Sequence, residues 1–359
     1  MSSPSKPVPS ARGETLRGSG LYRVAIVGAA TLKGKEVAEV LSDRSFPSVD
    51  VKLLDDDESL GQLETLGDEI SFIQRVRAEQ FEHLDFTFFA SDAECTRKNW
   101  IVARDAGSAI VDLSYALEAQ PEAAVRSPWI ERQLGIVHAP ELQPGPSVVA
   151  HPAATVLALL MLRAQKLGAI KRAIATIFEP ASEHGQKGMD ELHEQTVNLL
   201  SFQELPKKVF DTQVAFNLVS RYGEASLPPL SSIEQRILKH YRTIAGENAP
   251  PVSAMLVQGP VFHGHAFSIY LEMERAPSVT DLASALAGEH VSLSDSADSA
   301  PSNVNAAGQG DILVSIKPDA GQGSALWLWA AADNLRIAAT TAVECAESMT
   351  AGRPRGKIQ

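Results

Sequence analysis

The sequence predicts an α/β fold in which a doubly wound parallel sheet of the Rossmann type is followed by a second, α+β domain. Strand patterns and helical patterns alternate along the first 150 residues, as in repeated βαβ units. The chain has 359 residues, more than a single hydrophobic core usually supports. We expect the Rossmann-type domain at 21–155, the second domain at 156–329, and at 330–359 a C-terminal helix that packs back on the first domain.

The first strand, turn and helix organise the first domain. An unbroken apolar run at 24–27 suits a strand buried on both faces, and Gly28 ends it. Apolar residues at helical spacing follow from Leu32 onward. In the turn, Gly28 and Gly34 stand where a dinucleotide fingerprint has its first and third glycines. The middle glycine of the fingerprint lets a pyrophosphate approach the backbone, and Thr31 stands in its place here. A βα unit without a nucleotide is an equally good interpretation.

The second strand, at 51–54, is followed by an acidic run that begins at Asp55. In a dinucleotide fold an acidic side chain here accepts hydrogen bonds from ribose hydroxyls and repels a 2′-phosphate. No cofactor is assured, but NAD is favoured over NADP if one binds. The candidate cofactor-binding residues are therefore Gly28, Thr31, Leu32, Gly34 and Asp55. A solvated acidic turn after a strand is the alternative interpretation of Asp55.

The rest of the first domain continues the alternation. Strand patterns occupy 85–90 and 109–113, with a helical pattern at 92–106 between them. A buried-strand run at 147–150 ends at a proline and leads into an apolar segment. Chemistry in an open parallel sheet sits just past the carboxyl ends of its strands. At the end of this strand the sequence offers two alanines, Ala153 and Ala154.

The second domain shows a less regular order of patterns. Strand patterns at 170–178 and 257–274 flank an amphipathic helix at 189–200. A low-complexity stretch at 288–310 is expected to be a flexible loop, and a last helix is expected at 330–350. The first 20 residues, rich in Ser and Pro, are expected to form a disordered tail rather than a secretory signal.

Composition excludes several classes of partner. A net charge of -12 argues against nucleic acid, which requires a basic surface. The longest apolar run, 155–162, is too short to cross a membrane. The two cysteines are far apart, so neither a metal site nor a disulfide is predicted, and a reducing, cytoplasmic location is expected.

Six blocks of sequence, in order along the chain, resemble the aspartate-semialdehyde dehydrogenases. The similarity extends from Arg23 to Glu347 and is greatest to the paralogues that lack the catalytic cysteine. The blocks are GAATLKG at 28–34, HAPELQP at 138–144, AHPAAT at 150–155, ASEHGQKGMDEL at 181–192, SAMLVQGPVFHGH at 253–265 and ADNLR at 332–336.

The resemblance implies a set of site positions. In that family a cysteine thiolate attacks the aldehyde, hydride passes to NADP, and phosphate releases the thioester. The cysteine position falls on Ala154, the general base on His265, and the arginine that binds the substrate carboxylate on Gln258. Glu234 and Arg236 match a pair that helps hold substrate and phosphate, and are also compatible with a surface pair without a ligand.

These substitutions define the predicted function. The chain is expected to be a family homologue without thioester chemistry, with a scaffold, binding or regulatory role. The alternative is an NAD(P)-dependent semialdehyde dehydrogenase or other oxidoreductase of altered chemistry that uses His265 as its base. The resemblance also implies a homodimer, because the strand pattern at 255–271 is kept. The sequence names no small-molecule ligand.

Overall fold

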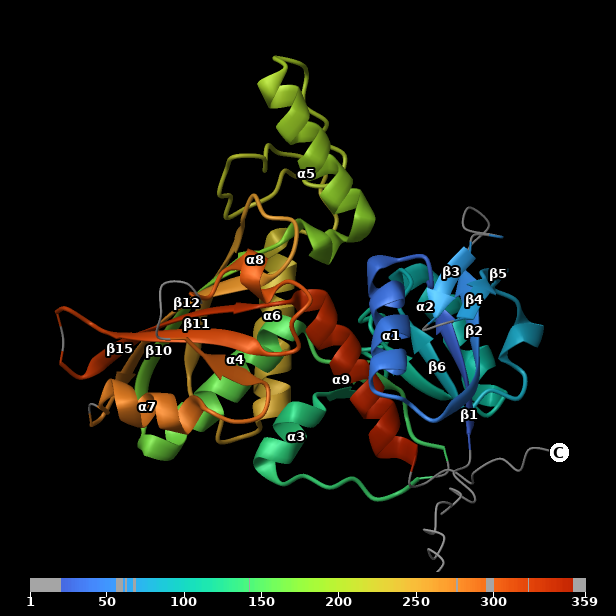
Figure 1. Ribbon diagram of the computed structural model, residues 1–359, viewed down its shortest axis with the longest axis horizontal. Coiled ribbons are helices and arrows are strands. Elements are labelled where there is room, and N and C mark those ends of the chain that lie inside the picture. Colours follow the sequence, from blue (N-terminus) through green and yellow to red (C-terminus); the bar gives the residue numbers. More distant parts are fainter. Residues whose placement is uncertain are drawn as a thin grey trace, which may run out of the picture.

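The computed structural model describes most of the chain as two domains that lie side by side (Figure 1). The expected tail at 1–20 lies outside the described residues. The structure describes residues 21–55, 61, 63–66, 69–141, 143–275, 277–294, 300–321 and 323–350. Between 56 and 71, only residue 61 has a described side chain.

The first domain is built on a seven-stranded sheet in which every described pairing is parallel. The strand order is β5-β2-β1-β6-β7-β9-β8, so the predicted doubly wound sheet is confirmed. β1 is an interior strand, and it is almost fully buried because helices cover both faces of the sheet. Its strands are β1 (Tyr22–Val27), β2 (Ser48–Asp55), β5 (Gln74–Arg75), β6 (Phe86–Phe89), β7 (Ala109–Asp112), β8 (Ala124–Arg126) and β9 (Ser147–Val149).

The helices of this domain are α1 (Leu32–Asp43), α2 (Ala93–Asp105) and α3 (Pro128–Leu134), with the short 3-10 helix η2 (Ala78–Phe81). A separate hairpin joins β3 (Leu63–Leu66) to β4 (Glu69–Phe72).

The second domain contains a six-stranded mixed sheet in the order β11-β10-β12-β15-β14-β13. This confirms the predicted second domain of sheet and helices. Its strands are β10 (Ile170–Glu179), β11 (Val252–Gln258), β12 (His265–Met273), β13 (Val291–Leu293), β14 (Ile312–Pro318) and β15 (Ala325–Ala332). Its helices are α4 (Pro152–Ala164), η3 (Gln165–Leu167), η4 (Ala181–His184), α5 (Gly185–Leu200), α6 (Leu230–Ala245), α7 (Val279–Leu286) and α8 (Asn303–Ala306).

Two expectations for this half of the chain are wrong in detail. The stretch 288–310 contributes β13 and α8, and only 295–299 within it lies outside the described residues. The last helix, α9, spans Asn334–Met349, whereas 330–332 belong to β15. The Asp333 side chain sets this boundary because it accepts hydrogen bonds from the first amides of α9.

The apolar segment after β9 forms α4, which is buried on nearly its whole circumference in the core of the second domain. Every helix among the described residues is too short or too polar to cross a bilayer.

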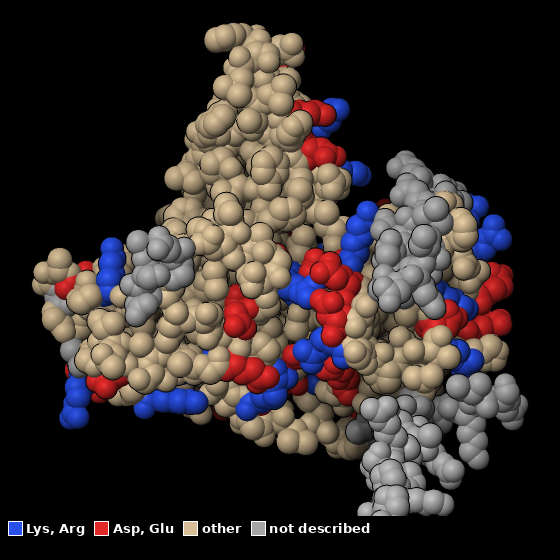
Figure 2. Space-filling model, in the orientation of Figure 1, with Lys and Arg blue, Asp and Glu red and all other residues tan. Residues whose placement is uncertain are grey.

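Helix α9 returns to the first domain and packs along α1 (Figure 1). Its apolar side joins the core formed by one face of the parallel sheet. On its exposed side, Arg336 contacts Glu36, Glu39 and Asp43 of α1. Charged side chains of both signs gather where the two domains meet, as Figure 2 shows.

Candidate functional site between the two domains

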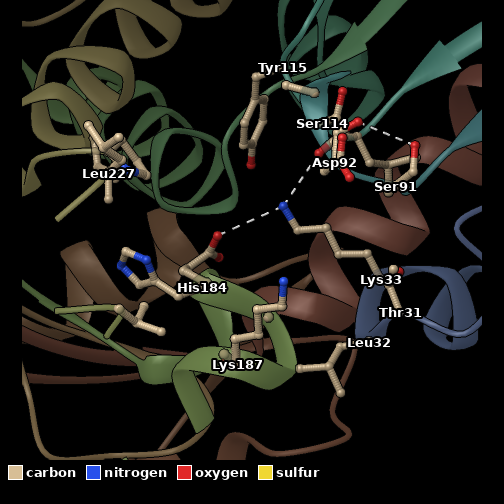
Figure 3. Close-up of a pocket in the computed structure, with 18 of the residues that line it drawn as sticks. Thr31, Leu32, Lys33, Ser91, Asp92, Ser114, Tyr115, His184, Lys187 and Leu227 are labelled. Atoms are coloured by element: carbon tan, nitrogen blue, oxygen red, sulfur yellow. Dashed lines mark hydrogen bonds and ion pairs between the residues drawn. The ribbon is translucent and has the colours of Figure 1, made fainter. Parts of the chain in front are cut away.

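A cavity of about 660 Å³ lies where the carboxyl ends of the parallel strands face the second domain. This is the place at which open α/β sheets bind ligands. Loops after β1, β6 and β7 line one side, and η4, the start of α5 and the segment 208–233 contribute to the other. Figure 3 labels several of the lining residues, among them Thr31, Leu32, Lys33, Tyr115 and Lys187. The lining also includes His151, Glu179, Glu183, Lys208 and Arg236.

The two glycines of the GAATLKG turn serve packing. A Cβ on Gly34 would lie 2.0 Å from the Gly28 carbonyl oxygen, so α1 approaches β1 too closely for any side chain. A Cβ on Gly28, where φ is +85°, would lie 2.5 Å from the backbone nitrogen of Ser91. Both positions therefore require glycine whether or not a nucleotide binds.

The amides of this turn are largely used within the protein. Ala30 N–H donates to the carboxylate of Asp55 over 2.7 Å, and Thr31 N–H donates to the Gly28 carbonyl over 3.0 Å. Gly34 N–H donates to the Thr31 hydroxyl over 3.0 Å, which caps α1. A phosphate cradle needs such amides to be free. These residues therefore do not fit a backbone cradle for a pyrophosphate in this arrangement.

Asp55 has a structural role that its sequence position did not predict. It is 8% exposed, and one carboxylate oxygen holds the Ala30 amide of the turn. The alternative of a solvated acidic turn is wrong for this residue. Asp56 and Glu58, which continue the acidic run, lie outside the described residues.

A buried histidine–carboxylate pair lies beside the cavity. Phe178 of β10 pairs with Ala266 of β12, so the next residues, Glu179 and His265, face each other. His265 Nε2 lies 2.9 Å from Glu179 Oε2, and both side chains are at most 1% exposed. Burial disfavours the charged ring, but the hydrogen bond and charge of Glu179 outweigh it and raise the pKa of His265. Glu179 lines the cavity, while His265 lies behind it.

His151, which follows the end of β9, is a site residue that the sequence does not predict. It caps α4, since its Nδ1 accepts from the Ala153 amide over 3.2 Å. Its ring stacks on Tyr115 with centroids 5.7 Å apart, and its Nε2 lies 3.9 Å from Glu183 Oε2. Burial lowers the pKa of His151 well below its usual value, so the ring is neutral.

Ala154 is fully buried in the core around α4 and does not line the cavity. The two cysteines lie elsewhere. Cys345 is buried in α9, where burial raises its pKa to about 12, and Cys95 is partly buried in α2. Neither thiol is among the residues that line the cavity.

Gln258 is not available to a ligand. Its Oε1 accepts from the Tyr222 hydroxyl over 2.6 Å, and its Nε2 donates to the carbonyls of Glu179 and Gly259. It is fully buried and lies outside the cavity lining. The predicted substrate-site role of Gln258 therefore does not hold in this structure, because its amide is saturated by the protein.

Glu234 and Arg236 do not form a surface pair, because side chains two positions apart on a helix point in different directions. Glu234 accepts from the Leu256 amide of β11 over 2.8 Å. Arg236 lines the cavity, where its guanidinium lies 4.9 Å from the Tyr115 ring centre and its Nε is 3.3 Å from Glu118. Although burial opposes it, the bond from His240 and the charge of Arg236 lower the pKa of Glu118 to about 2.

The lysines of the cavity differ in their partners. Lys33 Nζ lies 3.9 Å from Glu183 Oε2 and 4.8 Å from the Tyr115 ring centre. Burial opposes ionisation of Glu183, but the charge of Lys33 outweighs it and lowers the pKa of this carboxyl to about 2. Lys187 projects into the same space (Figure 3), and Lys208 also lines it. Neither has a carboxylate within ion-pair distance among the described residues.

Comparison with known proteins places this geometry in a family. Residues 23–138 match the family model "Semialdehyde dehydrogenase, NAD binding domain", and residues 159–337 match "Semialdehyde dehydrogenase, dimerisation domain". A USG-1 protein homolog of Pseudomonas aeruginosa is 32% identical over 69% of this chain and 73% of its own length. This chain belongs to the aspartate-semialdehyde dehydrogenase family.

Relatives within the family match over most of their length. The aspartate-semialdehyde dehydrogenase of Rickettsia bellii is 28% identical over 91% of this chain and 97% of its own. The structure of a probable aspartate-semialdehyde dehydrogenase from Pseudomonas aeruginosa has a TM-score of 0.79 at 28% identity, covering 91% of this chain and 98% of that one. Aspartate semialdehyde dehydrogenase II of Vibrio cholerae shares the fold, with a TM-score of 0.82 at 24% identity over 93% of this chain and 99% of that one.

Proposed function

We propose that this family member binds a small anionic molecule in the cavity between its domains, with a binding or regulatory role, and does not carry out thioester chemistry. The supporting observation is the fully buried methyl group of Ala154 at the position that the resemblance assigns to the cysteine. A hydride-donating hemithioacetal requires a reactive thiolate. Cys95 and Cys345 are distant in sequence, absent from the cavity lining, and have raised pKa values.

The charges of the cavity suggest the class of ligand. Lys33 and Arg236 each lie next to a carboxylate, so their charge is largely compensated. Lys187 and Lys208 lack such a partner among the described residues, and an ammonium group that faces a cavity attracts carboxylate or phosphate groups. The cavity is therefore suited to a small carboxylate or phosphate compound.

Two measurements on the full chain test this proposal. We expect no turnover of aspartate semialdehyde with phosphate and NAD or NADP. We also expect small carboxylates or phosphates to raise the thermal midpoint, and the double variant Lys187→Gln/Lys208→Gln to abolish that rise. Lys171→Gln is a matched control, because this lysine is exposed on β10 away from the cavity. Turnover of the semialdehyde would contradict the proposal. So would an equal rise in thermal midpoint for the double variant Lys187→Gln/Lys208→Gln and for the control Lys171→Gln.

The second candidate is an NAD-dependent oxidoreductase of altered chemistry. It is supported by the strand–turn–helix unit, from which Thr31, Leu32 and Lys33 line the cavity. The engaged turn amides and the burial of Asp55 weigh against it. Calorimetric titration with NAD, NADH and NADP distinguishes the two candidates. Saturable heat with NAD would favour the oxidoreductase, and no heat at millimolar concentration would favour the binding protein.

We further propose that the chain forms a homodimer through the open face of the second sheet. Directly paired residues point to the same face, so Met255, Thr176, Ser268 and Trp329 form one row across four strands. Ile174, in the next row on this face, is 44% exposed, and Met255 is 56% exposed. Exposed apolar side chains on adjacent strands mark an interaction surface.

Light scattering tests the dimer directly. We expect the mass of two chains for the wild type and of one chain for Met255→Asp. Val137→Asp is the control, because Val137 is 90% exposed but lies away from this sheet. A single-chain mass for the wild type at micromolar concentration would refute the dimer, and an unchanged mass for Met255→Asp would refute the interface.

A further inference from the structure

Three buried side chains converge at the edge of the cavity in a way that anion binding does not use. One ring nitrogen from His151, one from His265 and a carboxylate oxygen of Glu179 all lie within 4.8 Å of one another. Each side chain is at most 2% exposed. They come from three elements, the N-cap of α4, the start of β12 and the end of β10, so the fold brings them together from distant parts of the chain.

The donor set is one that transition metals prefer. Two imidazoles and one carboxylate bind zinc in enzymes that keep a fourth position for water or substrate, and they also suit other first-row ions. Bonds of roughly 2.0–2.2 Å to one ion place its ligand atoms about 3.4 Å apart in a tetrahedron. His265 Nε2 and Glu179 Oε2 are closer than this, at 2.9 Å, and the nitrogen of His151 lies within 4.8 Å of the other two donors, so side-chain rotation would bring all three to one ion.

Unsatisfied atoms provide a second, independent observation. Glu179 Oε1 and His265 Nδ1 are buried and have no hydrogen-bond partner among the described residues. Buried polar atoms are almost always paired, and an orphaned one indicates strain, chemistry or a missing ion or water. A carboxylate oxygen that is fully buried beside two histidines is a good ligand for a cation.

The surroundings also suit a divalent ion. Glu183 Oε2 lies 3.9 Å from His151 Nε2 and is held in place by Asn334, which donates to its other oxygen over 2.9 Å. This second carboxylate lies next to the three donors, and Lys33 Nζ, 3.9 Å from the same oxygen, offsets part of its negative charge. His151 and Glu179 line the cavity, so an ion bound between them would face the cavity with its remaining coordination position.

We propose that His151, Glu179 and His265 form a three-ligand site for a divalent transition-metal ion of the zinc type, open to the cavity. Binding releases to solvent the proton that His265 Nε2 now shares with Glu179 Oε2, and both atoms then bind the ion. Coordination by His151 Nε2 moves the ring proton to Nδ1, so the cap bond from the Ala153 amide is exchanged for the bond to the metal. The site does not depend on the anionic ligand proposed above.

The test uses the full-length protein and measures metal rather than activity. Chelator-stripped protein is titrated with Co²⁺, followed by its visible absorption, and Zn²⁺ is then added to displace it. Bound metal is counted by mass spectrometry after desalting. We expect one ion per chain, visible bands of a low-coordinate Co²⁺ site, and loss of these bands with Zn²⁺.

Three variants remove one donor each, His151→Asn, Glu179→Gln and His265→Gln, and we expect each to lower the affinity about 100-fold or more. His138→Gln is the matched control, because this histidine is 47% exposed and lies outside the cavity. Absence of bands and of bound ion in the wild type at tenfold excess overturns the proposal, as does wild-type affinity in the donor variants. If a donor variant fails to fold, the wild-type Co²⁺ spectrum decides alone.

Discussion

Replacing Gly34 by alanine tests whether the glycine turn is required for architecture. The added Cβ would lie 2.0 Å from the Gly28 carbonyl oxygen and 2.9 Å from the Ala29 Cα. Real Cβ atoms essentially never come within 3.0 Å of such atoms, so α1 must move away from β1 by about 1 Å. That movement stretches two of the hydrogen bonds of the Thr31 hydroxyl, the one from Gly34 N–H and the one to the Gly28 carbonyl.

The expected loss of stability follows from these contacts. Two hydrogen bonds contribute about 1 kcal/mol each. Overpacking of a close contact costs roughly 1–3 kcal/mol. Alanine in place of glycine within a helix returns about 1 kcal/mol. The sum is a destabilisation of about 2–4 kcal/mol, which lowers the thermal midpoint by roughly 6–12 °C if the domain unfolds as one unit.

The assay is thermal unfolding followed by tryptophan fluorescence, for which the buried Trp100 reports on the first domain. Gly310→Ala is the control, because a Cβ there meets nothing within 4 Å. We expect the control to stay within about 0.5 kcal/mol of the wild type. A wild-type midpoint for Gly34→Ala would refute the close-packing argument.

Three further predictions concern ionisable side chains. Burial lowers the pKa of His290, which stacks on Trp129, to about 4, so between pH 6.5 and pH 4 the unfolded chain binds one proton more than the folded chain. The contribution of the neutral ring to the unfolding free energy should be fully present above pH 6.5 and should fall by about 2 kcal/mol toward pH 4. In chemical denaturation, the unfolding free energy of His290→Gln should depend less on pH over this range. The carboxylate of Glu191 accepts from all three backbone amides of 208–210, so Glu191→Gln should lower the unfolding free energy by about 2 kcal/mol, and an unchanged urea midpoint would contradict this. Arg336→Gln should destabilise the contact between α1 and α9 by about 1 kcal/mol in low salt and less in 1 M salt, and a salt-independent loss in thermal scans would indicate lost packing instead.

The sequence determined the elements whose patterns are local. The apolar run at 24–27, the glycine that ends it and the helical spacing from Leu32 specified β1, its turn and α1, because burial on both faces and tight turns leave direct traces in the residue order. The sequence-based prediction of a helix was wrong at 330–332. Alanine occurs in both helices and strands, and here pairing with β12 makes these residues part of a strand.

The site shows the same division more sharply. The sequence assigned Gln258 and Asp55 to ligand binding. In the fold, the side-chain amide of Gln258 bonds to Tyr222, and a carboxylate oxygen of Asp55 accepts from the Ala30 amide. The sequence did not group His151, Glu179 and His265, which are separated by 28 and 86 residues along the chain. Residue order records which side chains are available, while antiparallel pairing of β10 with β12 and the docking of α4 decide which of them meet. Which donors are free to bind a ligand is therefore a property of the tertiary structure, because each buried polar group must first find its partner within the protein.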